Sequence, residues 1–242
     1  MEPERYLSHL DADSVRLAEV AREDLTRAVP PCPGWSVRDA VVHTGEVFWH
    51  KTMSMRLGDY RLTPDQWPQQ PAVDEDAVAW FLDAHNALRT ELVHRGPTAV
   101  TPTWWQPDQT VGFWYRRMAH EVAVHRADVE SAFGAITSLD DQLAVDGVDE
   151  VLLLFLDGDG RAPTGARGQR VAVETGGQRW VVLLDADRVR IDSGPSADAT
   201  VTGTPSDVDL WLWGRVGVDK LSVDGDRGAV QVLREWLVAA TQ

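Results

Sequence analysis

The sequence contains a single cysteine, Cys32, among its 242 residues. One cysteine excludes a disulfide within the chain and a zinc site built from cysteines. Cys32 lies between two prolines in Pro31-Cys32-Pro33-Gly34. This setting is typical of a small apolar residue in a turn, and a reactive thiol is the alternative for it.

Long apolar runs are also missing. The longest, residues 151–156, has six residues, whereas a helix that spans a bilayer needs about 20. The first residues, Met1-Glu2-Pro3-Glu4-Arg5, carry charges at once and precede no apolar signal region. We therefore expect a cytoplasmic protein without a membrane partner.

Basic residues are few, with 23 lysines and arginines against 38 acidic residues and a net charge of −15. Nucleic acids and anionic membranes bind basic patches, so this balance argues against both as partners. A hydrophobic content of 43% fits an ordinary globular protein. The length fits one large domain or two small ones, and the oligomeric state stays open.

The first 135 residues carry apolar side chains at helical intervals between stretches rich in proline and glycine. Ser36, with Asp39 three residues later, forms a variant of the capping box, which marks the start of a helix. The predicted helices cover residues 4–28, 36–57, 74–94 and 111–133. Four helices of this length predict a four-helix bundle, a fold that builds metal sites from side chains on facing helices.

Beyond a further predicted helix at 139–156, the apolar period changes from 3.6 residues towards two. The pair Gly176-Gly177 separates two alternating segments, which indicates a β-hairpin. The predicted strands are 171–175, 180–184, 188–192, 199–203 and 221–224, and the predicted helices begin at Pro205 and Ala229. We therefore expect an α plus α+β protein, with a helix bundle at 1–157 and a small α+β domain at 158–242.

The helix predicted at 111–133 holds the strongest candidate for a chemical site. Glu121 and His125 lie one turn apart on the same face, so both can reach one divalent ion. A third ligand must come from elsewhere, and His43 lies inside the helix predicted at 36–57. The alternative is an ordinary solvated helix face, and His120 competes with His125 as the partner of Glu121.

Two segments resemble the signatures of a known family. Residues 31–43 and 117–128 resemble those of the mycothiol-dependent maleylpyruvate isomerase family, which belongs to the DinB-like metal-binding four-helix bundles. Residues 199–207 and 212–215 are similar to the sterol-carrier-like C-terminal domain that many members carry. The resemblance covers nearly the whole chain and is more specific in the bundle.

The resemblance implies that His43, Glu121 and His125 are metal ligands, usually for zinc. A catalytic zinc keeps one open position, which here would hold the thiol of mycothiol as a thiolate near neutral pH. Attack of this metal-bound thiolate on a small electrophile implies an S-transferase or an isomerase, and we favour S-transfer. Zinc, nickel and iron all remain candidates on chemistry alone, and so does another thiol in place of mycothiol.

The resemblance also points to further site residues. Asp128, one turn beyond His125, is predicted to accept the free ring N–H of that histidine, with a surface charge as the alternative. Arg215 is predicted to bind an anionic substrate, with a structural salt bridge as the alternative. Three side chains are predicted to line the thiol-binding groove: Trp49, His50 and Trp105. His120 is expected to pack or cap, and His9, His85 and His94 are expected on helix surfaces.

Two other functions remain open at this stage. A non-catalytic metal-containing protein that binds or sequesters small molecules would carry the same ligands. A lipid carrier would use the C-terminal domain instead. The sequence does not identify the electrophile, and consumption of a thiol separates the enzyme from both alternatives.

Overall fold

The computed structural model describes residues 1–72, 76–159, 165–192 and 194–241. The chain divides into two compact units, Met1–Thr137 and Ser138–Gln242. The sequence-based boundary at 157/158 falls later, because it counts the fifth helix with the bundle. In the structure this helix packs against a helix of the second unit.

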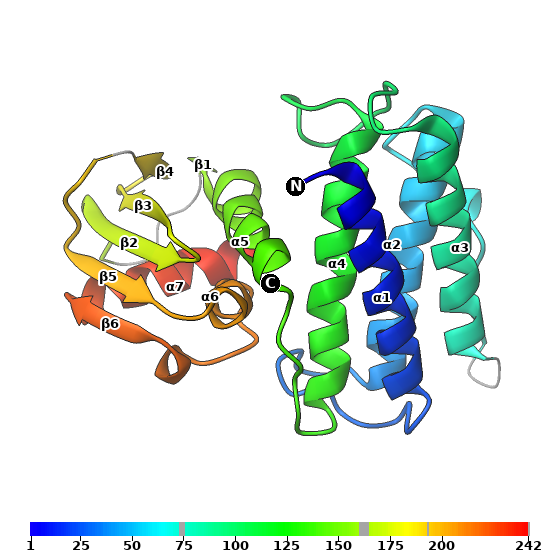
Figure 1. Ribbon diagram of the computed structural model, residues 1–242, viewed down its shortest axis with the longest axis horizontal. Coiled ribbons are helices and arrows are strands. Elements are labelled where there is room, and N and C mark those ends of the chain that lie inside the picture. The colour runs from blue at the N-terminus through cyan, green and yellow to red at the C-terminus, as the bar shows by residue number, and fades with distance from the viewer. Residues whose placement is uncertain (73–75, 160–164, 193, 242) are drawn as a thin grey trace. The chain divides into compact units, whose positions relative to one another are not determined.

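The first unit is a bundle of four long helices (Figure 1). They are α1 (Pro3–Ala21), α2 (Val37–Leu57), α3 (Ala77–Arg95) and α4 (Val111–Ser131). Helix α1 packs against α4 and α3, and α2 packs against α3 and α4. A short 3₁₀-helix, Pro64–Gln66, lies in the connection between α2 and α3. The predicted four-helix bundle is confirmed.

The helix ends follow local capping. Ser36 and Asp39 form the predicted capping box of α2, in which Asp39 Oδ2 accepts from the Ser36 N–H at 2.8 Å. Helix α1 ends at Ala21 rather than near residue 28, because Asp24 accepts hydrogen bonds from Thr26 and so favours a turn. The predicted start of the third helix, Asp74, lies outside the described residues.

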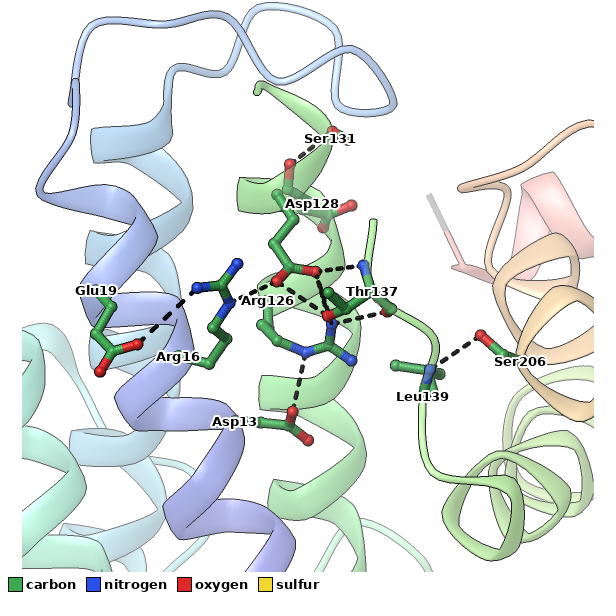
Figure 2. Close-up of polar contacts among 10 residues, drawn as sticks. Asp13, Arg16, Glu19, Arg126, Asp128, Ser131, Thr137, Leu139 and Ser206 are labelled. Atoms are coloured by element: carbon green, nitrogen blue, oxygen red, sulfur yellow. Dashed lines mark hydrogen bonds and ion pairs between the residues drawn. The ribbon is translucent and has the colours of Figure 1, made fainter. Parts of the chain in front are cut away.

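Helix α4 is buried along nearly its whole length and is held by buried charges. The Arg126 guanidinium pairs with Asp13 of α1 at 2.9 Å and with Glu130 at 2.7 Å. It also donates to the carbonyl of Thr137, in the segment that follows α4, at 2.8 Å. Arg16 of α1 pairs with Glu130 as well, and Figure 2 shows Asp13 and Arg16 of α1 facing Arg126. This network fixes the position of α4 against α1.

The second unit combines helices with a sheet in the strand order β1-β4-β3-β2-β5-β6. The strands are β1 (Gly158–Asp159), β2 (Gln169–Thr175), β3 (Gln178–Leu184), β4 (Arg188–Asp192), β5 (Ala199–Thr202) and β6 (Ser222–Gly225). Neighbouring strands are antiparallel except β2 and β5. Gly176 and Gly177, with φ of 55° and 77°, form the predicted hairpin turn between β2 and β3.

The helices of this unit are α5 (Asp141–Glu150), α6 (Pro205–Leu212) and α7 (Arg227–Thr241). Helix α7 packs against β2, β3 and β5, and α6 packs against α5 and β2. The apolar run Val151–Leu156 continues α5 as a π-helix, which the sequence pattern did not distinguish from an α-helix. The predicted fold class, a helix bundle followed by an α+β region, is confirmed. None of the helices in the described part of the chain combines the length and apolarity that crossing a bilayer requires.

Candidate metal centre

Helices α2 and α4 bring His43, Glu121 and His125 together, as the sequence predicted. The Nε2 atom of His43 lies 3.5 Å from Glu121 Oε1, and His125 Nε2 lies 3.3 Å from the same oxygen. One potential ligand atom from each residue lies within 4.8 Å of the others. The His43 side chain is 39% exposed, against 12% for Glu121 and 10% for His125. The group is therefore open to solvent on the side of His43.

The spacing of these atoms fits a tetrahedral ion. Two ligand atoms bonded to zinc at 2.0–2.1 Å in tetrahedral geometry lie about 3.3 Å apart. The two nitrogen–oxygen distances match this value, and they are long for ordinary hydrogen bonds. Two imidazole nitrogens and one carboxylate oxygen form a donor set that zinc accepts, and it leaves a fourth position for another ligand.

Neighbouring side chains orient two of the three candidate ligands. Asp128 is fully buried, and its Oδ2 lies 2.9 Å from His125 Nδ1. A proton on Nδ1 directs the lone pair of Nε2 towards Glu121. Arg117, one turn before Glu121, pairs with Glu121 Oε2 and leaves Oε1 facing the two histidines. Glu121 and His125 therefore each present one defined atom to a bound ion.

The same contacts set the charge states of the site without a metal. Burial acts to raise the pKa of Glu121, but Arg117 and the two histidines hold this pKa well below its ordinary value. Burial acts to lower the pKa of His125, but the hydrogen bonds with Asp128 and Glu121 outweigh it and raise this pKa to about 9. The site thus holds an ionised carboxylate, and His125 has to lose a proton before its Nε2 can bind a cation.

Trp35 belongs to the site, although the sequence analysis did not single it out. Its ring centroid lies 5.0 Å from that of His43 and 6.1 Å from that of His125, and it is nearly parallel to the latter. The residue stands just before the Ser36 cap of α2, where the chain enters the helix. Trp35 lies within the family-like segment 31–43, which marked this part of the chain, but only the fold shows that its indole covers both imidazoles.

Lys51 is a second residue that sequence reasoning missed. It lies eight residues after His43 on α2, which is about 12 Å along the helix axis. Its Nζ atom lies 5.0 Å from the centroid of the Tyr60 ring and 5.2 Å from that of Trp114. Burial lowers the pKa of Lys51 to about 8, against the opposing attraction of Glu121. A cation therefore lies among aromatic rings on the helix that carries the candidate ligand His43.

His50, predicted to line the groove, belongs to this aromatic cluster. Its ring lies 5.4 Å from Tyr60 and 5.3 Å from Trp67, and its Nδ1 accepts from Lys51 Nζ at 3.1 Å. Burial, followed by the charge of Lys51, lowers the pKa of His50 to about 4. The ring is thus neutral at physiological pH and serves as an acceptor for the ammonium group.

Trp49 and Trp105 are placed differently from the ligands. The indole nitrogen of Trp49 is buried and has no hydrogen-bond partner in the described part of the chain. The ring of Trp105 stacks on Phe113 at 6.3 Å, and Phe113 packs edge-on against Trp114 at 4.9 Å. Trp105 therefore reaches the Lys51 cluster only through other rings, and its groove-lining role remains a prediction.

Arg215 lies in the second unit, in the turn after α6. Its Nη1 donates to the carbonyl of Trp213 at 2.6 Å. The role of Arg215 in binding an anionic substrate remains a prediction. His85, expected on a surface, is instead buried, with Nε2 2.9 Å from Asp11 Oδ1 of α1. The pattern of apolar residues in α3 could not reveal this contact, because the contact forms only when α1 packs against α3.

The chain was compared with known families and structures. The family described as mycothiol maleylpyruvate isomerase N-terminal domain matches residues 7–130, and the MDMPI C-terminal domain matches residues 142–231. A crystal structure of the mycothiol-dependent maleylpyruvate isomerase is similar over 93% of this chain and 95% of that chain, with 12% identity and a TM-score of 0.55. A histidine-to-alanine mutant of that enzyme matches over the same shares, with 10% identity and a TM-score of 0.63. These identities show a shared fold. No curated protein matches the sequence.

Proposed function

The chain belongs to the mycothiol maleylpyruvate isomerase family, and from this membership we propose that it is a zinc-dependent enzyme that adds the thiol of mycothiol to a small electrophile. The observation that carries the proposal is the convergence of His43, Glu121 and His125 from two helices on one point. A structural metal site is closed, whereas this one has three protein ligands and an exposed histidine. The fourth position is therefore available to a thiol.

The metal supplies one property to the reaction when it is bound, because a zinc-coordinated thiol has a lowered pKa and is nucleophilic near neutral pH. The residues of the chain do the rest. Asp128 holds the proton on His125 Nδ1 and thereby keeps Nε2 available for the ion. Arg117 neutralises the carboxylate oxygen that faces away from the histidines. Trp35 covers one side of the imidazoles and excludes water there.

The reaction type follows from the fate of the carbon–sulfur bond. Attack of the sulfur on an electrophilic carbon forms this bond, and the electron pair moves onto the conjugated acceptor group. If the bond stays and the anionic adduct takes up a proton, which replaces the one that the thiol lost, the product is a thiol conjugate. If the sulfur leaves after rotation about the former double bond, the product is a geometric isomer. We propose S-transfer as the main activity, because the metal ligands set how the thiol is activated and not which electrophile is used.

The charges beside the metal ligands favour an electrophile that carries an anionic group. Lys51 makes no ion pair with a carboxylate in the described part of the chain, although the protein has a net charge of −15. Its ammonium group lies over the faces of Tyr60 and Trp114. A carboxylate on the electrophile would pair with Lys51 while its unsaturated body packs on the rings.

The test combines metal content with thiol consumption. Purified protein is expected to hold about one zinc per chain and to consume mycothiol, faster than the uncatalysed reaction does, when a maleimide is added. The variant His125→Ala is expected to lose metal and activity together, whereas His94→Ala, on the exposed end of α3, is expected to keep both. Activity in the metal-free protein would contradict the proposal. Bound metal with neither thiol consumption nor thiol-dependent isomerisation of maleylpyruvate would instead identify a binding or sequestration protein.

A further inference from the structure

A pocket in the second unit is lined by none of the three candidate metal ligands. It has a volume of about 400 Å³ and lies between the end of α6, the segment that follows it, β6 and α7. These elements belong to the same unit in Figure 1. Its apolar wall consists of Trp211, Val216, Val218, Val223 and Val230. Such a wall is suited to a flat or branched apolar body of a small molecule.

The polar side of the pocket comes from one face of α7. Arg227, Gln231 and Arg234 lie four and three residues apart, so they follow one another along the same side of the helix. No acidic side chain lines the pocket within the part of the chain that the structure describes. Because acidic residues outnumber basic ones by 38 to 23, two arginines in a pocket without a carboxylate depart from the general composition.

Neither arginine is neutralised by the protein. Arg234 Nη1 donates to the carbonyls of Trp211 and Leu212 at 2.9 and 3.1 Å, which caps the end of α6 but supplies no full negative charge. Burial, and then the nearby charge of Arg215, lower the pKa of Arg234. The side chain of Arg227 makes no hydrogen bond or ion pair with the described residues. The neighbouring carboxylate of Asp226 instead accepts from the Gly228 N–H at 2.7 Å.

From this geometry we propose that the pocket binds a small organic anion, with its carboxylate held by Arg227 and Arg234 and its apolar body against the valines and Trp211. A guanidinium group binds a carboxylate through two parallel hydrogen bonds, and Arg234 keeps Nε and Nη2 for this purpose. The ligand also relieves the repulsion between neighbouring arginines. None of the three candidate metal ligands lines the pocket, and its occupancy does not require a metal.

The proposal is tested by calorimetric titration of metal-free full-length protein with phenylacetate, its neutral amide phenylacetamide, and inorganic phosphate. Removal of the metal prevents the carboxylate from coordinating an ion, and the variants below distinguish this pocket from the rings around Lys51. We expect saturable binding of phenylacetate, and binding of the amide weaker by about tenfold, because the charge-assisted hydrogen bonds are lost. Phosphate, which lacks an apolar body, is expected to bind more weakly than phenylacetate. Equal affinity for the acid and the amide would overturn the proposal, as would no saturable binding.

Two variants locate the site. Arg227→Gln removes an exposed cation, and Gln231→Glu adds a carboxylate between the arginines, so both are expected to weaken phenylacetate binding by about tenfold. The matched control is Lys220→Gln. Lys220 is a nearby exposed cation that does not line the pocket, so this change is expected to leave phenylacetate binding unchanged. His125→Ala is expected to bind phenylacetate as well as the wild-type protein. Wild-type affinity in Arg227→Gln and Gln231→Glu, or lost affinity in His125→Ala, would refute the assignment.

Discussion

The hydrogen bond between His125 and Asp128 allows the proposed metal site to be tested with a change of one atom. In Asp128→Asn, an amide nitrogen replaces one carboxylate oxygen at a fully buried position. The amide oxygen still accepts from His125 Nδ1, but it carries no net charge, and its NH₂ group favours the wrong tautomer when the amide flips. The wild-type contact of 2.9 Å is a buried, charge-assisted hydrogen bond, which contributes about 1.5–3 kcal/mol.

A loss of this size corresponds to a decrease in zinc affinity of about 10- to 100-fold. We expect this decrease in a competition titration against a chromophoric chelator at neutral pH, together with a matching rise in the zinc concentration needed for half-maximal activity. Asp83→Asn, the same change at an exposed position of α3, is the control and is expected to bind zinc normally. Circular dichroism establishes that both variants are folded. A folded Asp128→Asn protein with wild-type zinc affinity would refute the role assigned to this carboxylate.

Three further predictions concern charges in the bundle. Lys51→Met is expected to raise the KM for electrophiles that carry a carboxylate by about tenfold and to leave neutral electrophiles unaffected, and steady-state kinetics with an acid and its amide would contradict this if both changed equally. Arg126→Met leaves Glu130 with a buried charge and one fewer partner, so urea unfolding is expected to show a loss of about 3 kcal/mol; an unchanged midpoint would show that the network of Figure 2 does not stabilise α4. Burial lowers the pKa of His85 although Asp11 opposes it, so the unfolded chain binds more protons and stability is lost as the pH falls below the unfolded pKa of about 6.5. His85→Gln is expected to reduce the slope of stability against pH between about pH 5 and 7, and an unchanged slope would contradict this account.

Much of the fold could be predicted from local patterns. The capping box at Ser36, the glycines of the hairpin at Gly176 and the change of apolar period depend on neighbours in the chain, and they mark element starts and turns in the structure. The predicted element bounds and types were wrong where local sequence preferences compete with contacts between distant segments. Helix α1 ends early at a turn formed by Asp24, and the apolar run Val151–Leu156 adopts a π-helix. The second unit begins before α5, because α5 buries its apolar face against α6.

The candidate ligands likewise have features that the sequence predicts and features that only the fold reveals. The spacing of Glu121 and His125 on one helix suffices to place them on one face, since a helix repeats every 3.6 residues. The family resemblance added His43 from a distant segment. Spacing could not show that Asp128 is buried, that Arg117 occupies one oxygen of Glu121, or that Trp35 covers two imidazoles.

The sequence by itself thus determined the class of fold and the helices that carry the candidate ligands, because periodicity, caps and motifs are properties of neighbouring residues. Only the tertiary structure decided the surroundings of those ligands. The aromatic cluster around Lys51 combines side chains from α2, from a loop and from α4. The pocket of Arg227 and Arg234 needs β6 and the end of α6 as its wall. Burial, charge pairing and pKa depend on which segments meet in space, and that is a result of packing the whole chain.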